Sequence, residues 1–440
     1  MNKNKVRLPI ACLVVSLCSV AARADLAERI DGILASQKGV HYSIHVVEAE
    51  SGRTAYAHDD REALIPASNM KIITGAAALE FLGPQFEYQT RAGLCGDTLV
   101  VVGSGDPLLG DRRLAEKYGK EPDWVLDDIA EKLKTRGIRS IEDIVVDTTI
   151  FDDQRVHPRW PRDQLNRWYA CEVSGLNYNN NCVDIIARRV NGRVVVTTEP
   201  LTRYLLMINE ITPIAEGDSA IGSYRNRHPN KLTLKGRVSS QATLADVAIE
   251  RPAGFMGFLL AERLASEGIK AEGKLLEKEF DCTERCDVIG MYTTRMADCL
   301  DRCNKNSLGL VAECFVKTIA AHNDPARKDG NWEEGCELIG RFLSRIGIDQ
   351  SQYYIDDGSG LSRQNELSAH AITTVLLHVY RGKNWDMYAR SLAVGGLDGT
   401  LRKHFKQEPY KGRIRGKTGY IAGVKSLSGI CSTDRGDYIF

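Results

Sequence analysis

The stretch from Ile65 to Gly83, IPASNMKIITGAAALEFLG, places Ser68 three residues before Lys71 at the start of an apolar segment. Residues at i and i+3 are neighbours on a helix, so the two side chains touch if SNMK opens one. Pro66 directly before them suits a helix entry. A serine hydroxyl becomes a nucleophile beside a base, and a lysine amine becomes a base when burial lowers its pKa. The stretch therefore predicts a helix that begins with a nucleophile and its base.

A second short motif near the other end of the sequence gives this pattern more weight. SxxK alone decides nothing, because a chain of this length should contain roughly one or two by chance. The stretch RGKTGY contains Lys417, Thr418 and Gly419, a tripeptide expected only about a tenth of the time by chance. Lys417 and Thr418 are suited to hold a carboxylate, and Gly419 lets a substrate backbone approach an exposed strand edge. Read alone, the tripeptide is equally the start of an ordinary strand.

The first residues predict export. Lys3, Lys5 and Arg7 precede an apolar run that ends in Ala-Arg-Ala, the pattern of a secretory signal peptide over residues 1–24. A helix of about fifteen residues is too short for the roughly 30 Å core of a bilayer. We expect an exported protein, periplasmic or otherwise extracytoplasmic, whose contact with a membrane surface is peripheral at most.

Charge and cysteine content narrow the class of partner. The 58 basic and 58 acidic side chains form no long single-sign block, so the chain lacks the electrostatic footprint of a nucleic-acid binder. Twelve cysteines suit an oxidising compartment. Cys171 and Cys182 enclose the loop EVSGLNYNNN and are predicted to form a disulfide. Four more cysteines in two CxxxC spacings favour disulfides or free buried thiols over a zinc site; they are Cys282, Cys286, Cys299 and Cys303.

Helical patterns at both ends flank a strand-rich middle. After a helical segment at residues 26–37, two alternating segments around a glycine turn predict an antiparallel pair, and the helix of the opening stretch follows. Short strand patterns then run to about Ile249, including a hairpin that turns at Asn191 and Gly192. The expected architecture is one discontinuous α/β domain, residues 25–87 and 290–440, with an inserted strand-rich region, residues 88–289, of two subdomains. Since the last strand pattern stops at Phe440 without a closing helix, we expect a truncated product or fragment.

The two motifs belong to a longer set of family-like stretches. Ser307, Leu308 and Gly309 lie between them and match the third motif, SxN, except that glycine replaces the asparagine. The chain resembles the class C low-molecular-mass penicillin-binding proteins, the D-alanyl-D-alanine carboxypeptidase and endopeptidase family, over nearly its whole mature length. The stretches that carry the resemblance are PASNMKIITGAAALEFLG, IVVDTTIFDD, NKNSLGLVAECF, YYIDDGSGLSRQNELSA and RGKTGY.

The resemblance implies a fold, an activity and partners. The fold is a penicillin-binding or β-lactamase-like transpeptidase domain, with helices on an antiparallel sheet and a large insertion. The activity is that of a serine hydrolase that trims peptidoglycan stem peptides through an acyl-enzyme, at a site that β-lactam antibiotics also acylate. No metal or organic cofactor is required. The family also has a counterpart of the Cys171 and Cys182 pair.

Roles for individual residues follow from the resemblance, position by position. Ser68 is the nucleophile, Lys71 its proton acceptor, and Ser307 relays a proton to the leaving amine. Lys417 and Thr418 position the substrate carboxylate.

Two further family positions concern the oxyanion and the stem. The backbone N–H groups of Ser68 and Tyr420 form the oxyanion hole. Arg363, in DGSGLSR, matches a position near the subsite for the stem's side chain, where a guanidinium can pair with a diaminopimelate carboxylate. The alternative for Arg363 is a scaffold ion pair with Asp356 or Asp357.

Gly309 keeps a second function open. Losing the asparagine amide costs about 1 to 3 kcal/mol, or roughly ten- to a hundredfold in rate, unless Asn304, Asn306 or a water replaces it. The first hypothesis is an active, weakened or specialised peptidase. The alternative is a catalytically inactive relative that binds peptidoglycan as a wall-associated scaffold. A β-lactamase is less favoured, because no glutamate or tyrosine element for fast deacylation is identifiable.

Overall fold

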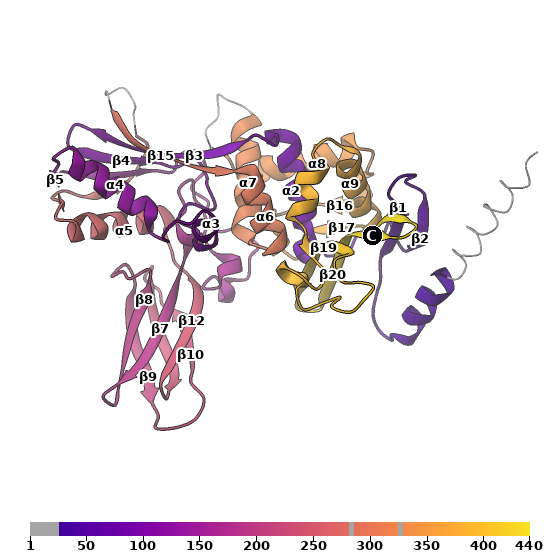
Figure 1. The fold of residues 1–440 in the computed structure, drawn as a ribbon, viewed down its shortest axis with the longest axis horizontal. Helices are drawn as coiled ribbons and strands as arrows, with labels where there is room; N and C mark the ends of the chain where they lie inside the picture. The colour runs from indigo at the N-terminus through magenta and orange to yellow at the C-terminus, as the bar shows by residue number, and fades with distance from the viewer. Residues whose placement is uncertain (1–25, 281–285, 324–328) are drawn as a thin grey trace, which may run out of the picture.

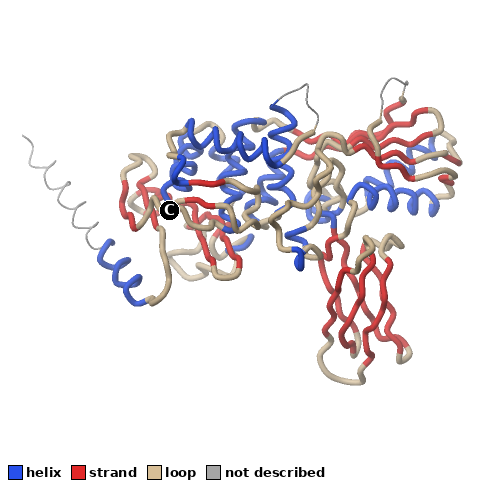
Figure 2. The backbone as a smooth tube through the Cα atoms, turned by 180° about the vertical axis from the view of Figure 1, so that it is seen from behind, coloured by secondary structure: helices blue, strands red, loops and turns tan. Residues whose placement is uncertain are grey.

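The computed structural model describes residues 26–280, 286–323 and 329–440. The expected signal peptide and Cys282 lie outside these ranges. Helices gather in one half of the molecule around the C-terminal sheet, and strands dominate the other half (Figures 1 and 2). In the part of the chain that the structure describes, no helix combines the length and apolar character needed to cross a membrane.

The helical half is built on a six-stranded antiparallel sheet. In spatial order its strands are β18 (Ala393–Val394), β19 (Ile414–Ile421), β20 (Val424–Thr433), β21 (Gly436–Ile439), β1 (Ile44–Glu48) and β2 (Thr54–His58). The helices around it are α2 (Met70–Leu82), α6 (Met296–Lys305), α7 (Gly309–Asn323), α8 (Trp332–Arg345), α9 (Ala369–Arg381) and α10 (Trp385–Ser391). The predicted class, helices on an antiparallel sheet, is confirmed. The sheet joins the first strands of the chain to the last, so the domain closes only when both ends have folded.

Helix α2 is the central helix of this half. Its residues from Met70 to Leu79 are all buried, because the segment is apolar on every face and packs against α6, α7, α8 and α9. Gly83 ends the helix with a φ of 83°, a conformation that suits glycine. The predicted helix is confirmed, and its N-terminus is fixed by burial of nearly every following side chain.

A mixed five-stranded sheet forms the outer part of the strand-rich half. Its order is β14 (Leu275–Glu277), β6 (Ile144–Asp147), β4 (Thr98–Val102), β3 (Glu87–Cys95) and β15 (Asp287–Arg295). The helices that accompany it are α3 (Arg112–Lys117), α4 (Trp124–Thr135) and α5 (Pro252–Ser266), and a small parallel pair joins β5 (Ser140–Ile141) to β13 (Lys270–Ala271). Long β15 carries the chain from this sheet directly back into α6.

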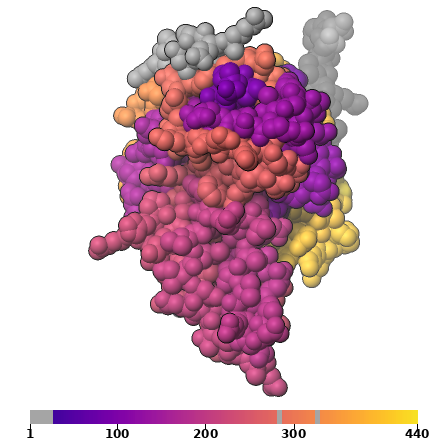
Figure 3. All heavy atoms as spheres, turned by 90° about the vertical axis from the view of Figure 1, so that its left-hand side faces the viewer, coloured from indigo at the N-terminus to yellow at the C-terminus, as the bar shows by residue number. Residues whose placement is uncertain are grey.

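Six more strands form a lobe that projects from the rest of the molecule (Figures 1 and 3). They make two three-stranded sheets. The strands are β12 (Gln241–Ala248), β7 (Cys182–Val190) and β8 (Arg193–Glu199) in one sheet, and β10 (Ala220–Arg225), β11 (Lys231–Val238) and β9 (Leu206–Pro213) in the other. The predicted β7–β8 hairpin with its turn at Asn191 and Gly192 is confirmed. Strands β9 to β12 were not resolved individually by the sequence patterns.

Two large hydrophobic cores correspond broadly to the two halves, but the inserted region contributes to both. Phe151, Trp160 and Cys171 from the insertion pack in the core of the helical half. The second core lies among the strands and helices of the insertion. The segment around residues 151–182 therefore anchors the insertion to the helical half. The domain boundaries drawn from the sequence stay a prediction.

The first helical segment is less embedded than its sequence pattern suggested. It is helical over residues 26–36, but its apolar side is only partly covered, and Ile33 is 63% exposed. Tyr56 on β2 donates a hydrogen bond to Asp31 at 2.5 Å, which ties this helix to the edge of the six-stranded sheet.

Candidate active site

The N-terminus of α2 presents Ser68 next to Lys71. A 3₁₀ turn at Ala67–Asn69 leads directly into the helix, so the two side chains lie one turn apart on the same face. Lys71 Nζ donates to Ser68 Oγ at 3.1 Å. Ser68 is partly exposed whereas Lys71 is only 2% exposed. The hydroxyl can therefore be reached from solvent, and the amine beneath it cannot.

Lys71 is held by neutral oxygen atoms. Besides the Ser68 hydroxyl, its amine donates to the main-chain carbonyl of Ser359 at 2.7 Å. Burial lowers the pKa of Lys71, while the nearby Cys303, Glu313 and Asp357 favour its charged form. A lysine whose pKa is lowered by desolvation is the kind of amine that can act as a base near neutral pH.

Glu313 and Asp357 shape the loop that supplies the Ser359 carbonyl. Glu313, on the buried face of α7, accepts hydrogen bonds from the N–H groups of Gly358 at 3.0 Å and Ser359 at 2.8 Å. Asp357 accepts from the N–H groups of Gly360 at 2.7 Å and from Ser362. Burial, followed by the charge of Asp357, raises the pKa of Glu313 to about 7. The two carboxylates replace the ordinary ladder of backbone hydrogen bonds and fix the loop.

A glycine in this loop allows it to press against the start of α2. Gly360 has a φ of 78°, and a Cβ there would lie 1.8 Å from the carbonyl oxygen of Ala67. No larger residue fits without moving the backbone that precedes Ser68. The loop is therefore a direct support of the nucleophile.

Ser307 and Lys417 form a second pair on the opposite side of the site. Ser307 follows α6 with a φ of 60°, and its hydroxyl accepts from Lys417 Nζ at 2.8 Å. Lys417 is fully buried on β19 and also donates to the carbonyl of Thr418 at 2.6 Å. Burial lowers the pKa of Lys417 far below its ordinary value, and the charge of Lys71 lowers it further.

Strand β19 passes very close to the N-terminus of α2. A Cβ on Gly419 would lie 3.0 Å from the backbone nitrogen of Ser68 and 2.8 Å from the carbonyl of Pro66, so this position requires glycine. Strand β18 pairs with β19 only at Arg415 and Gly416. Beyond that point, no described strand covers this edge of β19, which leaves it open for an extended peptide. Tyr420, the next residue along, is 71% exposed.

Arg363 lies at the far end of the same strand. Its Nη1 donates to the main-chain carbonyl of Ala422 at 2.9 Å, and the side chain is exposed. The alternative ion pair with Asp356 or Asp357 is not formed: Asp356 pairs instead with Arg159 at 2.6 Å. The guanidinium thus borders the open edge of β19 rather than the scaffold.

The space beside Gly309 is occupied by Ser359. A Cβ on Gly309 would meet the Tyr169 carbonyl at 3.3 Å and the Ser359 side chain at 3.6 Å. The two asparagines considered as substitutes are engaged elsewhere. Asn304 donates to Ser391 at 2.8 Å, and Asn306 accepts from Arg302 at 2.6 Å.

Ser359 and Glu313 were missed by the sequence reading. Both lie in quoted stretches, DGSGLSR and NKNSLGLVAECF, but nothing in a single sequence indicates which side of a loop faces a lysine. An acidic residue on an otherwise apolar helix face was the one available signal for Glu313.

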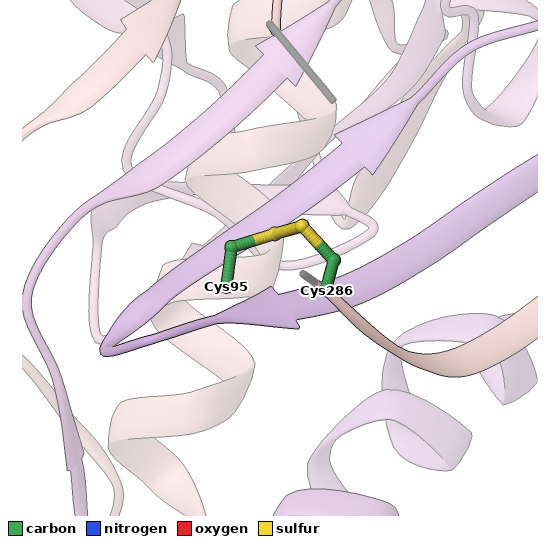
Figure 4. The surroundings of a disulfide bond; sticks show 2 residues. All are labelled: Cys95 and Cys286. Atoms are coloured by element: carbon green, nitrogen blue, oxygen red, sulfur yellow. A yellow bond between two sulfur atoms is a disulfide. The ribbon is translucent and has the colours of Figure 1, made fainter. Parts of the chain in front are cut away.

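The cysteine predictions need correction. Cys171 and Cys182 are buried free thiols, so the predicted bridge between them is wrong, and Cys95 is instead joined to Cys286 (Figure 4). The partners are 191 residues apart, and they meet because Asp287 of β15 pairs with Leu94 of β3. A short sequence spacing favoured the wrong pair, because it ignores this strand pairing.

Cys299 and Cys303 lie one helical turn apart on α6. They are buried free thiols on α6, as one of the alternatives allowed. Among the described residues, one group of potential metal ligands lies close together, namely His41, Asp59 and Glu62, and all three are exposed on the surface near β2.

Comparison with known proteins gives one family. The family model described as D-Ala-D-Ala carboxypeptidase 3 (S13) matches residues 26–440. A D-alanyl-D-alanine carboxypeptidase of Actinomadura sp. (strain R39) is 28% identical over 452 residues, which cover 96% of this chain and 81% of that protein. D-alanyl-D-alanine carboxypeptidase DacB of Haemophilus influenzae is 22% identical over 396 residues, covering 86% and 79%.

The fold is shared with a solved structure. The crystal structure of penicillin binding protein 4 (dacB) from Haemophilus influenzae superposes with a TM-score of 0.76 at 20% identity, covering 92% of this chain and 89% of that one. The same protein has been solved in complex with a β-lactam, and that structure gives a TM-score of 0.70.

Proposed function

The chain belongs to the D-Ala-D-Ala carboxypeptidase 3 (S13) family, and we propose that it cuts peptidoglycan stem peptides through an acyl-enzyme on Ser68. It is a serine-type carboxypeptidase or endopeptidase by family. One observation carries the proposed mechanism. Two buried amines at the open edge of β19 each donate a hydrogen bond to a serine hydroxyl, Lys71 to Ser68 and Lys417 to Ser307.

In the first step, Ser68 Oγ attacks the carbonyl carbon between the two D-alanines. Its proton passes to Lys71 Nζ, 3.1 Å away, whose lowered pKa lets the amine accept it. The C–N bond then breaks, and the leaving nitrogen takes a proton through Ser307, whose hydroxyl is bound to Lys417. The proton that Lys71 took from Ser68 is the one delivered through Ser307, so Lys71 is neutral again when water attacks the ester; the water's proton passes to Lys71 Nζ and then to Ser68 Oγ as the ester bond breaks.

The oxyanion is held by backbone N–H groups. Those of Ser68 and Tyr420 are the donors, brought together because Gly419 lets β19 approach the nitrogen of Ser68. Such preorganised donors stabilise the charge that develops in the transition state, and removing one typically costs about 10²- to 10³-fold in rate.

The open edge of β19 orients the substrate. Lys417 and Thr418 attract the carboxylate of the terminal D-alanine, and the stem runs along the strand towards Arg363 at its far end, where a guanidinium is placed to meet a side-chain carboxylate. β-Lactams present a strained amide and a carboxylate in a similar arrangement, so they should acylate Ser68 as well.

The location of the protein follows from this reaction, and the division into domains is the one that the sequence patterns predict. Peptidoglycan lies outside the cytoplasm, so the protein acts there, and the leader pattern of residues 1–24 is the means of export. Residues 25–87 and 290–440 form the catalytic domain, and residues 88–289 form an insertion that borders the site.

Labelling with a fluorescent penicillin tests this function. Wild-type protein should become covalently labelled and should release D-alanine from a peptide that ends in D-alanyl-D-alanine. Ser68→Ala should lose both properties by roughly 10³-fold or more, because the bond-forming atom is gone. Ser240→Ala, an exposed serine in the β11–β12 turn, is the matched control and should keep both. Label that persists in Ser68→Ala, or a folded wild-type protein that binds stem peptides without releasing D-alanine, would refute the proposal and favour a wall-binding scaffold.

A further inference from the structure

Two buried tryptophans lie behind the loop that carries Ser359. Trp160 belongs to the insertion, and Trp332 is the first residue of α8. Each side chain is only 3% exposed. The proposed mechanism uses neither of them. A buried tryptophan usually donates its indole N–H to an acceptor, so the acceptors show which part of the molecule each side chain holds.

The two indoles donate to the two carboxylates that fix this loop. Trp332 Nε1 donates to Glu313 Oε2 at 2.7 Å. Trp160 Nε1 donates to Asp357 Oδ2 at 2.9 Å. Glu313 is 1% exposed and Asp357 is fully buried, so bulk water cannot replace either donor. A buried carboxylate that loses a donor is costly, and the backbone that it holds can move to find another partner.

The hydrogen bond from Trp332 leads to the catalytic amine in three steps. Glu313 Oε2 accepts from the indole and from the N–H of Gly358 at 3.0 Å, and Oε1 accepts from the N–H of Ser359 at 2.8 Å. The carbonyl of Ser359 in turn accepts from Lys71 Nζ at 2.7 Å. The position of this carbonyl therefore depends on a carboxylate that Trp332 helps to hold.

The hydrogen bond from Trp160 leads to the nucleophile. Asp357 accepts from this indole and from the N–H of Gly360 at 2.7 Å. Gly360 lies against the carbonyl of Ala67, the residue before Ser68, where a Cβ would come within 1.8 Å. The insertion thus has a direct connection to the backbone that presents the serine.

Ring packing fixes the direction of both indoles. The ring centroids of Trp160 and Trp332 are 5.9 Å apart at an interplanar angle of 71°, and His157 lies 5.2 Å from Trp332 at 87°. Such edge-to-face contacts restrict the rotation of the rings. His157 and Trp160 come from the insertion, whereas Trp332 comes from α8. The cluster therefore forms only when the insertion has docked on the catalytic half.

We propose that Trp160 and Trp332 are positioning residues of the active site. Their indole N–H groups hold the two carboxylates of the loop, and this keeps the Ser359 carbonyl against Lys71. The inference rests on the proposed function for the role of the lysine. Because Trp160 belongs to the insertion, the insertion supports the reacting groups in addition to bordering the site.

Replacing each indole by a phenyl ring removes the N–H and keeps most of the apolar ring. In Trp160→Phe and in Trp332→Phe, we expect the rate constant of acylation by a penicillin to fall about tenfold. The dissociation constant of the first, non-covalent complex should change less than about twofold, because the loop positions the reacting groups. Stopped-flow labelling over a range of penicillin concentrations separates the two constants. Trp385→Phe, which alters a ring that packs on Tyr380 at 5.0 Å, is the matched control and should change neither.

A second measurement does not depend on catalysis. The N–H of Trp332 favours the charged form of Glu313, so its loss should raise the pKa of Glu313 above the value of about 7. In the wild type, this group lowers stability as pH rises from about 4.5 to about 7; in Trp332→Phe the decline should continue above pH 7. Melting temperatures between pH 4.5 and about 9 measure this, with Trp385→Phe as the control. The substitution leaves unchanged the other titratable groups that face Glu313, which are Lys71, Cys171, Cys303, Cys336 and Asp357 on neighbouring elements and Cys314 and Lys317 on α7.

The outcomes separate this inference from the proposed function. An acylation rate constant that stays unchanged in both variants, or that falls equally in Trp385→Phe, would overturn the inference. A weaker non-covalent complex with an unchanged rate constant would also overturn it, because the tryptophans would then shape the binding site. If the wild type took no label, the proposed function itself would fail, and the pH profile of Trp332→Phe would still show whether the indole holds Glu313. The two variants test the inference separately, so one decides if the other does not fold.

Discussion

The active site and the middle of α7 each bury a lysine, but they treat its charge in opposite ways. Lys317 is fully buried and forms an ion pair with Asp152, donates to the carbonyl of Gln154 at 2.7 Å and lies 4.0 Å from the Trp332 ring. Lys71 is also buried, yet only the neutral oxygens of a serine hydroxyl and a carbonyl accept from it.

The difference separates a structural lysine from a reactive one. Asp152 and Gln154 belong to the insertion, so the pair with Lys317 fastens the insertion to α7. A buried amine with a counter-ion stays charged and holds two segments together. A buried amine without one is easily deprotonated and can accept a proton from the neighbouring hydroxyl. The same side chain thus serves stability in one place and chemistry in the other, according to whether a carboxylate accepts a hydrogen bond from it.

Replacing each lysine by methionine should give the largest effects and should separate the catalytic lysine from the structural one. Lys71→Met removes the proton acceptor, so penicillin labelling should fall by roughly 10³-fold or more, while stability changes little because no carboxylate is left unpaired. Lys317→Met leaves Asp152 without its partner and should lower the free energy of unfolding by about 1 to 3 kcal/mol. Its labelling rate per folded molecule should stay within about twofold of the wild type. Urea unfolding and labelling kinetics measure the two effects. If Lys71→Met mainly lowered stability and Lys317→Met mainly lowered the labelling rate, the roles given to the two lysines would be wrong.

The pH dependence of labelling should show which protonation state of Lys71 is active. Acylation needs the neutral amine, and burial lowers the pKa of Lys71 below its ordinary value of 10.5. The rate should therefore rise about tenfold per pH unit on the acidic limb and level off below pH 10.5, as the amine loses its proton. Stopped-flow labelling between pH 5 and about 10 measures this, with circular dichroism at each pH as the control for folding. A rate that falls with rising pH would mean that the charged lysine is the active form.

Local motifs and tertiary support were not equally accessible to sequence reasoning. The contact between Ser68 and Lys71 follows from their spacing on one helix. Gly419 was expected to admit a substrate backbone, whereas the backbone that comes close to it belongs to Pro66 and Ser68. The groups that support Lys71 cannot be predicted from spacing in the sequence, because the packing of α7 against a distant loop brings Glu313 and Ser359 to it. The disulfide was mispredicted for the same reason: Cys95 and Cys286 meet through the pairing of β3 with β15, and no short spacing encodes that pairing.

Glu313 tests this tertiary support directly. In Glu313→Gln, the amide NH₂ must face the backbone N–H of Gly358 or of Ser359, and this N–H then has no acceptor, at a cost of about 1 to 3 kcal/mol. The loop should shift its carbonyl away from Lys71, and the labelling rate should fall about tenfold. Glu337→Gln, on the exposed face of α8, is the matched control. An unchanged rate would show that the loop holds without the carboxylate.

The pKa of Glu313 adds a second signature. Burial raises the pKa of Glu313 in the folded protein to about 7, above its ordinary 4.5, so the folded state binds this proton more tightly than the unfolded state. This carboxyl group should therefore lower stability as pH rises from about 4.5 to about 7. Glu313→Gln should flatten the stability profile over that interval when melting temperatures of the two proteins are compared. A parallel profile would show that the carboxyl group does not titrate there.

Gly309→Asn should have the smallest effect, and it tests whether the missing motif asparagine limits the enzyme. Lys71 already has the Ser68 hydroxyl and the Ser359 carbonyl as acceptors, so a new amide has no unfilled role at the amine. A Cβ at this position meets Ser359 in ordinary contact, and the Tyr169 carbonyl at 3.3 Å must give way slightly. We expect the labelling rate to stay within about threefold of the wild type. Gly309→Ala is the matched control for the Cβ alone. A gain of tenfold or more from the asparagine would mean that Ser359 does not replace the lost amide and that this site works below its capacity.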